Sequence, residues 1–115
     1  MNIENFEHAV LELLEDMKAI DPTRLDVRSL TSVTDTMIIA SGSSERQLKA
    51  IANRLAIMAK EQNKRPLGIE DEGGWILVDL GDLIVHLMTP SVREFYNLEK
   101  LWGMIEQRRE AGHKL

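Results

Sequence analysis

Apolar residues recur at intervals of three and four along the first twenty positions. The stripe consists of Ile3, Phe6, Val10, Leu13, Leu14, Met17 and Ile20. This spacing places all of its members on one side of an α-helix, so it predicts an amphipathic helix with a buried face. Asp21-Pro22 is expected to end that helix, because proline removes a backbone donor and clashes with the preceding turn.

A second stripe of the same period predicts a helix in the middle of the chain. It consists of Leu48, Ile51, Ala52, Leu55 and Met58. Ser44 and Gln47 match a capping box at its start, in which each side chain accepts a hydrogen bond from a free backbone N–H of the first turn. The helix is expected to fade near residues 62–63.

Shorter apolar runs predict strands before and after this helix. Residues 25–28 alternate like a half-buried strand, and residues 37–40 form the uninterrupted apolar run of a central strand. Residues 66–69 are predicted to form an edge strand, since Pro66 cannot donate to a ladder.

Residues 75–88 predict a β-hairpin, because glycine first in the two-residue loop Gly81-Asp82 suits a type II′ turn. The turn fixes the register of the two strands. One face then pairs Ile76 with Leu87, Val78 with Val85 and Leu80 with Leu83, and is expected to be core. The other face pairs Trp75 with Met88, Leu77 with His86 and Asp79 with Ile84. This mixture of large apolar groups, a carboxylate and an imidazole marks a candidate binding surface.

The last apolar stripe predicts a final helix, with Ser91 and Glu94 as a second capping box. Its expected buried residues are Val92, Phe95, Leu98, Leu101, Trp102 and Ile105. Arg93 and Tyr96 lie off this stripe, and with Trp75 they are candidates for partner contact, because Trp, Tyr and Arg are the usual anchors of protein interfaces. The elements together predict an α/β fold with a single mixed sheet of about five strands flanked by helices. We expect one domain over residues 1–115, in which 102–115 are the end of the last helix and a tail.

Composition narrows the choice of partner and compartment. The net charge is −5, whereas proteins that bind nucleic acid through phosphates need clustered Lys and Arg, so a basic protein is favoured over DNA or naked RNA. The chain has no cysteine for a disulfide or a thiolate metal site. It lacks a signal-peptide pattern and an apolar stretch of the roughly 20 residues that span a bilayer. We therefore expect a cytoplasmic protein without membrane attachment.

Motifs for catalysis are weak in this sequence. The three histidines show no ligand spacing, and the fingerprints of dinucleotide sites, P-loops and nucleophile elbows are absent. Asp79 and Asp82 bracket the hairpin turn and could hold Mg²⁺ for phosphoryl transfer, with residues 41–43 as a phosphate-contacting turn. Aspartate is also a standard turn residue, so the pair does not establish an enzyme. No cofactor is expected.

Four segments resemble one known family. They are Leu25-Asp26-Val27-Arg28, the run from Thr34 to Gln47, the run from Trp75 to His86, and Arg93-Glu94-Phe95-Tyr96-Asn97-Leu98-Glu99-Lys100-Leu101-Trp102. Together they resemble the ribosomal silencing factor family, also called the Iojap-related family. The resemblance runs from about residue 3 to residue 102. The loop 70–74 departs from it, because Asp71 stands where the family has glycine.

The resemblance implies a fold similar to nucleotidyltransferases but without their active site. It implies a translational repressor that binds the large ribosomal subunit through the universal large-subunit ribosomal protein numbered fourteen, which is basic and faces the small subunit. Occupying that protein would block subunit joining when nutrients are short, and would repress translation and ribosome biogenesis without any catalysis. The implied binding surface comprises Trp75, Asp79, His86, Arg93 and Tyr96, with Leu77 and Met88 as apolar neighbours.

Two alternatives stay open. One is a nucleotidyltransferase-like enzyme that uses Asp79 and Asp82 with Mg²⁺. The other is a dimerisation module that uses the same sheet face, and a homodimer is also compatible with the ribosome-binding hypothesis.

Overall fold

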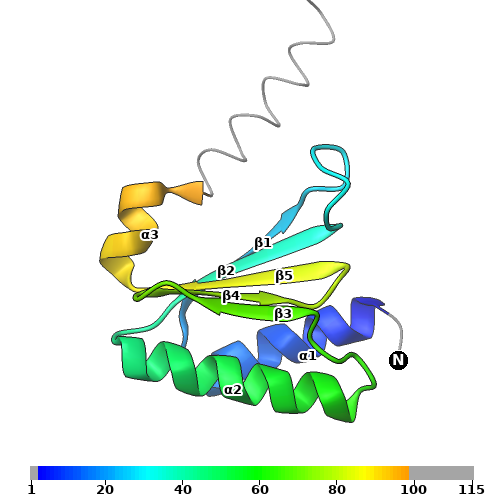
Figure 1. Cartoon of the computed structure of the whole chain (residues 1–115), viewed down its shortest axis with the longest axis horizontal. Helices are drawn as coiled ribbons and strands as arrows, with labels where there is room; N and C mark the ends of the chain where they lie inside the picture. Colours follow the sequence, from blue (N-terminus) through cyan, green and yellow to red (C-terminus); the bar gives the residue numbers. More distant parts are fainter. Residues whose placement is uncertain (1–2, 99–115) are drawn as a thin grey trace, which may run out of the picture.

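The computed structural model describes residues 3–98 of the chain (Figure 1). Within them the elements follow the order α1 (Ile3–Asp16), β1 (Ile20–Asp26), β2 (Thr36–Ser41), α2 (Glu45–Glu61), β3 (Gly68–Asp71), β4 (Trp75–Asp79), β5 (Leu83–Met88) and α3 (Pro90–Tyr96). The five strands form one sheet in the order β1-β2-β5-β4-β3. Only β2 and β5 are parallel, so the predicted single mixed sheet of five strands is confirmed.

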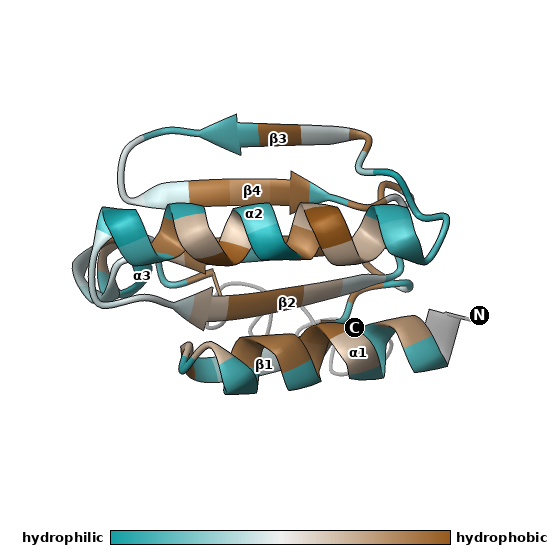
Figure 2. Ribbon diagram, turned by 90° about the horizontal axis from the view of Figure 1, so that it is seen from below, coloured by the Kyte–Doolittle hydropathy of each residue, from teal (hydrophilic) through white to brown (hydrophobic). Residues whose placement is uncertain are grey.

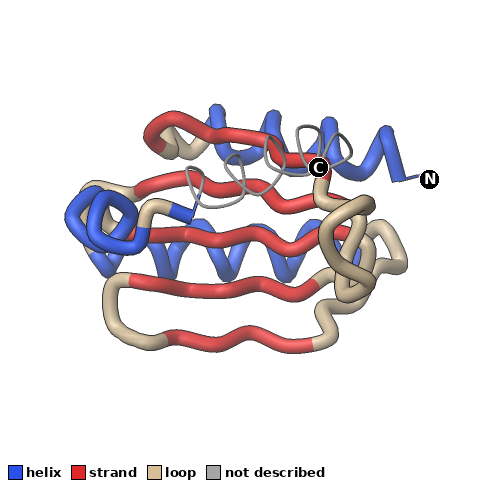
Figure 3. Tube along the Cα trace, turned by 90° about the horizontal axis from the view of Figure 1, so that it is seen from above, coloured by secondary structure: helices blue, strands red, loops and turns tan. Residues whose placement is uncertain are grey.

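The helices lie on different faces of the sheet. Helices α1 and α2 run beneath one face, whereas the short α3 lies on the other side, beyond one end of the strands (Figures 1 and 3). In the described residues no helix is both long enough and apolar enough to cross a bilayer.

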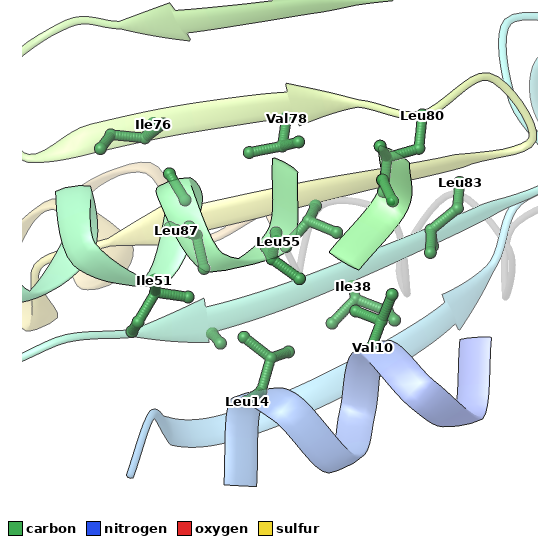
Figure 4. Packing of buried hydrophobic residues seen from close by; sticks show 14 of the residues in the cluster. Val10, Leu14, Ile38, Ile51, Leu55, Ile76, Val78, Leu80, Leu83 and Leu87 are labelled. Atoms are coloured by element: carbon green, nitrogen blue, oxygen red, sulfur yellow. The ribbon is translucent and has the colours of Figure 1, made fainter. Parts of the chain in front are cut away.

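The hairpin register is the one that the Gly81-Asp82 loop predicts. Trp75 pairs with Met88, Leu77 with His86 and Asp79 with Ile84. Gly81 has a φ of 89°, the left-handed value that a type II′ turn requires at its first loop position. The aliphatic residues of the inner face pack against α1 and α2, as Figure 4 shows. Their side chains are buried together with Phe6, Val10, Leu14, Ile38, Leu48, Ile51 and Leu55.

Helix α1 ends at Asp16, earlier than predicted, and Ile20 belongs to β1 with 39% of its surface exposed. Lys18 adopts a left-handed φ of 60°. The N–H of Lys18 donates to the carbonyl of Glu15, and the N–H of Ala19 donates to that of Leu14. This is a Schellman ending, for which the sequence offers no glycine as a signal. The expectation that Asp21-Pro22 ends the helix was therefore wrong, and both residues lie in β1.

The predicted start of α2 is confirmed. The backbone N–H of Gln47 donates to the hydroxyl of Ser44 at 3.1 Å. The amide oxygen of Gln47 accepts from the N–H of Ser43 at 2.6 Å, one residue earlier than in a standard capping box. Strand β3 begins at Gly68, two residues after Pro66, which leaves proline outside the ladder.

Helix α3 differs most from its prediction. Its N-cap is Thr89 and Pro90 opens its first turn, so the capping box assigned to Ser91 and Glu94 was wrong. Asn97 takes a left-handed φ of 47° and ends the helix after Tyr96. Phe95 is 81% exposed, which contradicts its assignment to the core. The predictions for Leu101, Trp102 and Ile105 concern residues outside the described ones.

Candidate partner-binding surface

The residues proposed for partner contact gather on the outer face of β4 and β5 and on α3. Because side chains alternate along a strand, Trp75, Leu77 and Asp79 all point away from α2. All three are half-buried. The paired residues on β5 are less accessible: His86 is 6% exposed and Met88 is fully buried. Met88 is buried beside its strand partner Trp75, and a contact between Met88 and a partner stays a prediction.

A hydrogen bond ties Trp75 to His86. The indole Nε1–H of Trp75 donates to Nδ1 of His86 at 3.1 Å, and the two rings lie 5.8 Å apart. An indole nitrogen can only donate, so Nδ1 of His86 must be the acceptor, and the imidazole proton sits on Nε2. Burial lowers the pKa of His86 to about 4, so the ring is neutral at physiological pH. In this arrangement His86 orients Trp75.

Trp75, Tyr96 and Phe95 form an aromatic cluster. The ring centroids of Trp75 and Tyr96 are 4.8 Å apart, and those of Tyr96 and Phe95 are 5.0 Å apart at an interplanar angle of 80°. Such tilted and edge-to-face pairs are the favoured geometries of aromatic rings. Tyr96 is 52% exposed, so the cluster offers a broad apolar surface. Phe95 was missed as a surface residue because the helical period alone assigned it to the core.

Arg93 holds α3 against the sheet. Its guanidinium donates to the carbonyls of Ile20 at 3.1 Å and Asp21 at 2.8 Å. It also donates to the hydroxyls of Ser41 at 3.1 Å and Thr23 at 3.2 Å. Four of the hydrogen bonds of this side chain thus connect α3 to β1 and to the end of β2. The structural role of Arg93 is to fix the position of Tyr96, and a contact between Arg93 and a partner stays a prediction.

A shallow hollow with an acidic rim lies beside the aromatic cluster. Its volume is about 170 Å³, and it is lined by Glu70, Glu72, Trp75 and Leu77. Glu70 pairs with Leu77 across β3 and β4, so it lies on the same face as Trp75. Both glutamates are exposed. The hollow therefore combines an apolar floor with two carboxylates at its edge.

Asp79 has a local task in the hairpin. Its Oδ1 accepts a hydrogen bond from the N–H of Gly81 at 2.9 Å, which stabilises the turn. Over residues 3–98, no group of three or more His, Asp or Glu side chains is placed to hold a metal ion. The hydrogen bond to Gly81 gives Asp79 a structural role in the turn.

Exposed aromatic side chains, an apolar hollow and a charged rim are the features of a protein interface. The described surface therefore has the character of a protein-binding surface.

Comparisons with known proteins agree on one family. The family described as "Ribosomal silencing factor during starvation" matches residues 1–114. The ribosomal silencing factor RsfS of Chromobacterium violaceum is 44% identical over 105 residues, which cover 90% of this chain and 86% of the relative. The factor of the same name from Bacillus subtilis is 37% identical over 105 residues, covering 90% of this chain and 89% of the relative.

A chloroplastic Iojap protein of Arabidopsis thaliana is 36% identical over 99 residues, which cover 85% of this chain and 42% of the relative. A crystal structure of a Chromobacterium violaceum protein superposes with a TM-score of 0.84 at 44% identity, covering 90% of this chain and 88% of that one. The similarity thus extends over nearly all of the chain in both sequence and fold.

Proposed function

The chain belongs to the ribosomal silencing factor family, whose function is ribosome-associated silencing of translation, and we propose that it binds the large ribosomal subunit and sterically blocks subunit joining. Its partner would be the universal large-subunit ribosomal protein numbered fourteen, and it would act in the cytoplasm under nutrient limitation. Such a block needs no catalysis and no cofactor, because a seated domain excludes the small subunit by its volume.

The observation that carries this proposal is the exposed aromatic cluster beside an acidic rim. A stable protein interface buries roughly 1,200 to 2,000 Å² in total and is anchored by a few aromatic or arginine side chains. Trp75 and Tyr96 would be the anchors, with Phe95 and Leu77 beside them. The carboxylates of Glu70 and Glu72 would face a basic ribosomal protein, where opposite charges speed encounter and fix orientation.

The remaining residues would act from behind this surface. His86 would hold the indole of Trp75, Arg93 would hold α3, and Met88 would pack beside Trp75 on the same face of the sheet. Asp79 would stabilise the turn and add negative charge at the hairpin end of the surface. A homodimer that covers the aromatic cluster would have to open before the protein meets the ribosome.

The test is to replace Trp75 with alanine and to measure co-sedimentation with purified large subunits. Truncating an anchor tryptophan costs about 2 kcal/mol or more, so the affinity should fall by roughly thirtyfold or more. The same variant should no longer inhibit the joining of subunits in a light-scattering assay. Val33→Ala is a suitable control, because Val33 is 72% exposed and belongs to the segment between β1 and β2, outside the aromatic cluster.

Two results would contradict the proposal. A folded Trp75→Ala variant that co-sediments as well as the wild type would remove the aromatic cluster as the anchor. A wild-type protein that binds large subunits without slowing subunit joining would leave the binding in place and exclude the steric block.

A further inference from the structure

The charge of this acidic protein is unevenly distributed. The segment from residue 45 to residue 65 contains six of the fourteen basic residues and only two acids, Glu45 and Glu61. The six are Arg46, Lys49, Arg54, Lys60, Lys64 and Arg65. The rest of the chain is correspondingly more acidic than its net charge of −5 suggests. A net charge of this kind conceals a local surface of the opposite sign.

These cations line the outer side of α2. Arg46, Lys49, Asn53 and Lys60 are spaced by three, four and seven residues, which places them on one stripe of the helix, whereas Arg54 is five residues from Lys49 and lies off this stripe. In Figure 2, where α2 lies in front of the sheet, hydrophilic segments recur along its visible surface. From Arg46 to Lys60 the stripe is about 21 Å long at the helical rise of 1.5 Å per residue. We call Arg46, Lys49 and Lys60 the basic stripe.

The basic stripe contributes little to the fold. All three side chains are exposed. None of them forms an ion pair with any residue of the described part of the chain. Arg46 stands in the first turn of α2, where the positive end of the helix dipole disfavours a cation. The three charges also repel one another, so their positions are better explained by a partner than by stability.

A hollow marks the far end of the stripe. It has a volume of about 240 Å³ and is lined by Lys60, Asn63 and Arg65. Two cations and an amide around one depression can donate several hydrogen bonds to the oxygens of a single anionic group, as phosphate contacts require. Lys64 is engaged elsewhere, because its ammonium lies 5.8 Å from the ring centroid of Phe6.

We propose that the outer face of α2 binds the phosphate backbone of RNA through the basic stripe. A row of exposed cations about 21 Å long, without bulky aromatic side chains between them, matches a polyanion and offers little to read base sequence. The choice of RNA over other polyanions rests on the proposed function, because an RNA backbone surrounds any protein seated on a ribosomal subunit. The stripe lies on the helix-covered side of the sheet, so this contact leaves the aromatic cluster free for its protein partner.

The experiment compares two double variants of equal charge change. Lys49→Gln/Lys60→Gln removes two cations of the stripe, and Lys18→Gln/Arg28→Gln removes two exposed cations outside it, of which Arg28 pairs with Asp26. Glutamine has a helix propensity close to those of Lys and Arg, so α2 should stay folded. Fluorescence anisotropy with a labelled short RNA duplex of mixed sequence, taken over a range of salt concentrations, gives the affinity and its salt dependence.

The wild-type protein should bind the duplex weakly at physiological salt, with a Kd on the order of 10⁻⁴ M, and more tightly at low salt. The slope of log K against log salt concentration should become less negative by about 2 in the stripe variant, because each lost phosphate contact contributes roughly 0.9 to the slope. The control variant should change the slope by much less than half of that amount. Equal changes in the two variants, or none in either, would overturn the proposal.

Two further arms separate the possible partners. If the stripe variant loses binding to phosphatidylglycerol vesicles while the wild type ignores RNA, the occupant is a lipid surface and the RNA assignment is wrong. On purified large subunits, Trp75→Ala and the stripe variant are measured side by side. Loss of binding in Trp75→Ala alone, with an unchanged salt slope in the stripe variant, would leave the proposed function standing and remove the RNA contact.

Discussion

The two faces of the β4–β5 hairpin are built from alternating residues of the same two strands, yet they differ in composition and burial. On the inner face every side chain is aliphatic and covered by α1 and α2. On the outer face Trp75 and Leu77 are half-buried, and a hydrogen bond between Trp75 and His86 replaces part of the apolar packing. The difference suggests that changes on the inner face alter stability, whereas changes on the outer face alter binding.

The largest effect should come from Leu87 on the inner face. Leu87→Ala removes a fully buried side chain and leaves a cavity among residues of α2 and β2, so the free energy of unfolding should fall by about 2 to 5 kcal/mol. Urea denaturation followed by circular dichroism measures this loss. Leu77→Ala on the neighbouring strand is the matched control, and it should cost less than half as much because Leu77 is partly exposed. Similar losses in the two variants would break the distinction between the faces.

A smaller effect concerns pH and His86. The folded-state pKa of about 4 lies below the ordinary histidine value of 6.5, so the unfolded chain binds more protons between these two values. Stability is therefore complete above a pH of about 6.5 and declines as the pH falls toward 4. At 1.36 kcal/mol for each unit, this single group should account for about 3 kcal/mol across the window.

The test of this window is His86→Asn, whose side-chain oxygen can still accept from the indole of Trp75 and does not titrate in this range. Urea denaturation at several pH values between 4 and 7 should give a flatter profile for the variant than for the wild type. Parallel profiles would mean that His86 is not the group responsible. Protonation of His86 would also oppose the Trp75 hydrogen bond, since two donors would then face each other.

The smallest of the three effects on stability should come from Arg93. Arg93→Gln leaves the carbonyls of Ile20 and Asp21 without their donor, which should cost about 1 to 3 kcal/mol. Hydrogen exchange should become faster in α3 and at the start of β1, while the amides of β5 stay protected. Arg93→Lys should be intermediate, because an ammonium cannot reproduce the planar fork of the guanidinium. Unchanged exchange in α3 would show that Arg93 is not what holds this helix.

Local sequence patterns were sufficient to predict the structure wherever one strong signal, such as a turn or a helix cap, acted between residues close in sequence. The Gly81-Asp82 loop predicted the whole register of the hairpin, because a two-residue turn leaves no freedom in pairing. The Ser44 cap and the apolar stripe predicted α2 for the same reason. The same register predicted the mixed outer face, in which Trp75 pairs with Met88 and Leu77 with His86.

Other features depended on partners that are distant in sequence. Arg93 and Ile20 are 73 positions apart, and no periodicity indicates that the guanidinium of one meets the carbonyl of the other. The cations of the basic stripe are present in the sequence, but the net charge of −5 does not reveal them. Only the folded structure shows that they are exposed and form no ion pair within the described residues.

The sequence by itself determined the α/β class, the strand register of the hairpin and the family, since these depend on turn geometry, periodicity and motifs read locally. The tertiary structure alone decided where α1 and α3 end, which placed Ile20 in a strand and left Phe95 in solvent. The reason is that non-glycine residues such as Lys18 and Asn97 adopt left-handed conformations only when the surrounding packing compensates for their strain. That compensation arises from contacts that exist only once the chain has folded.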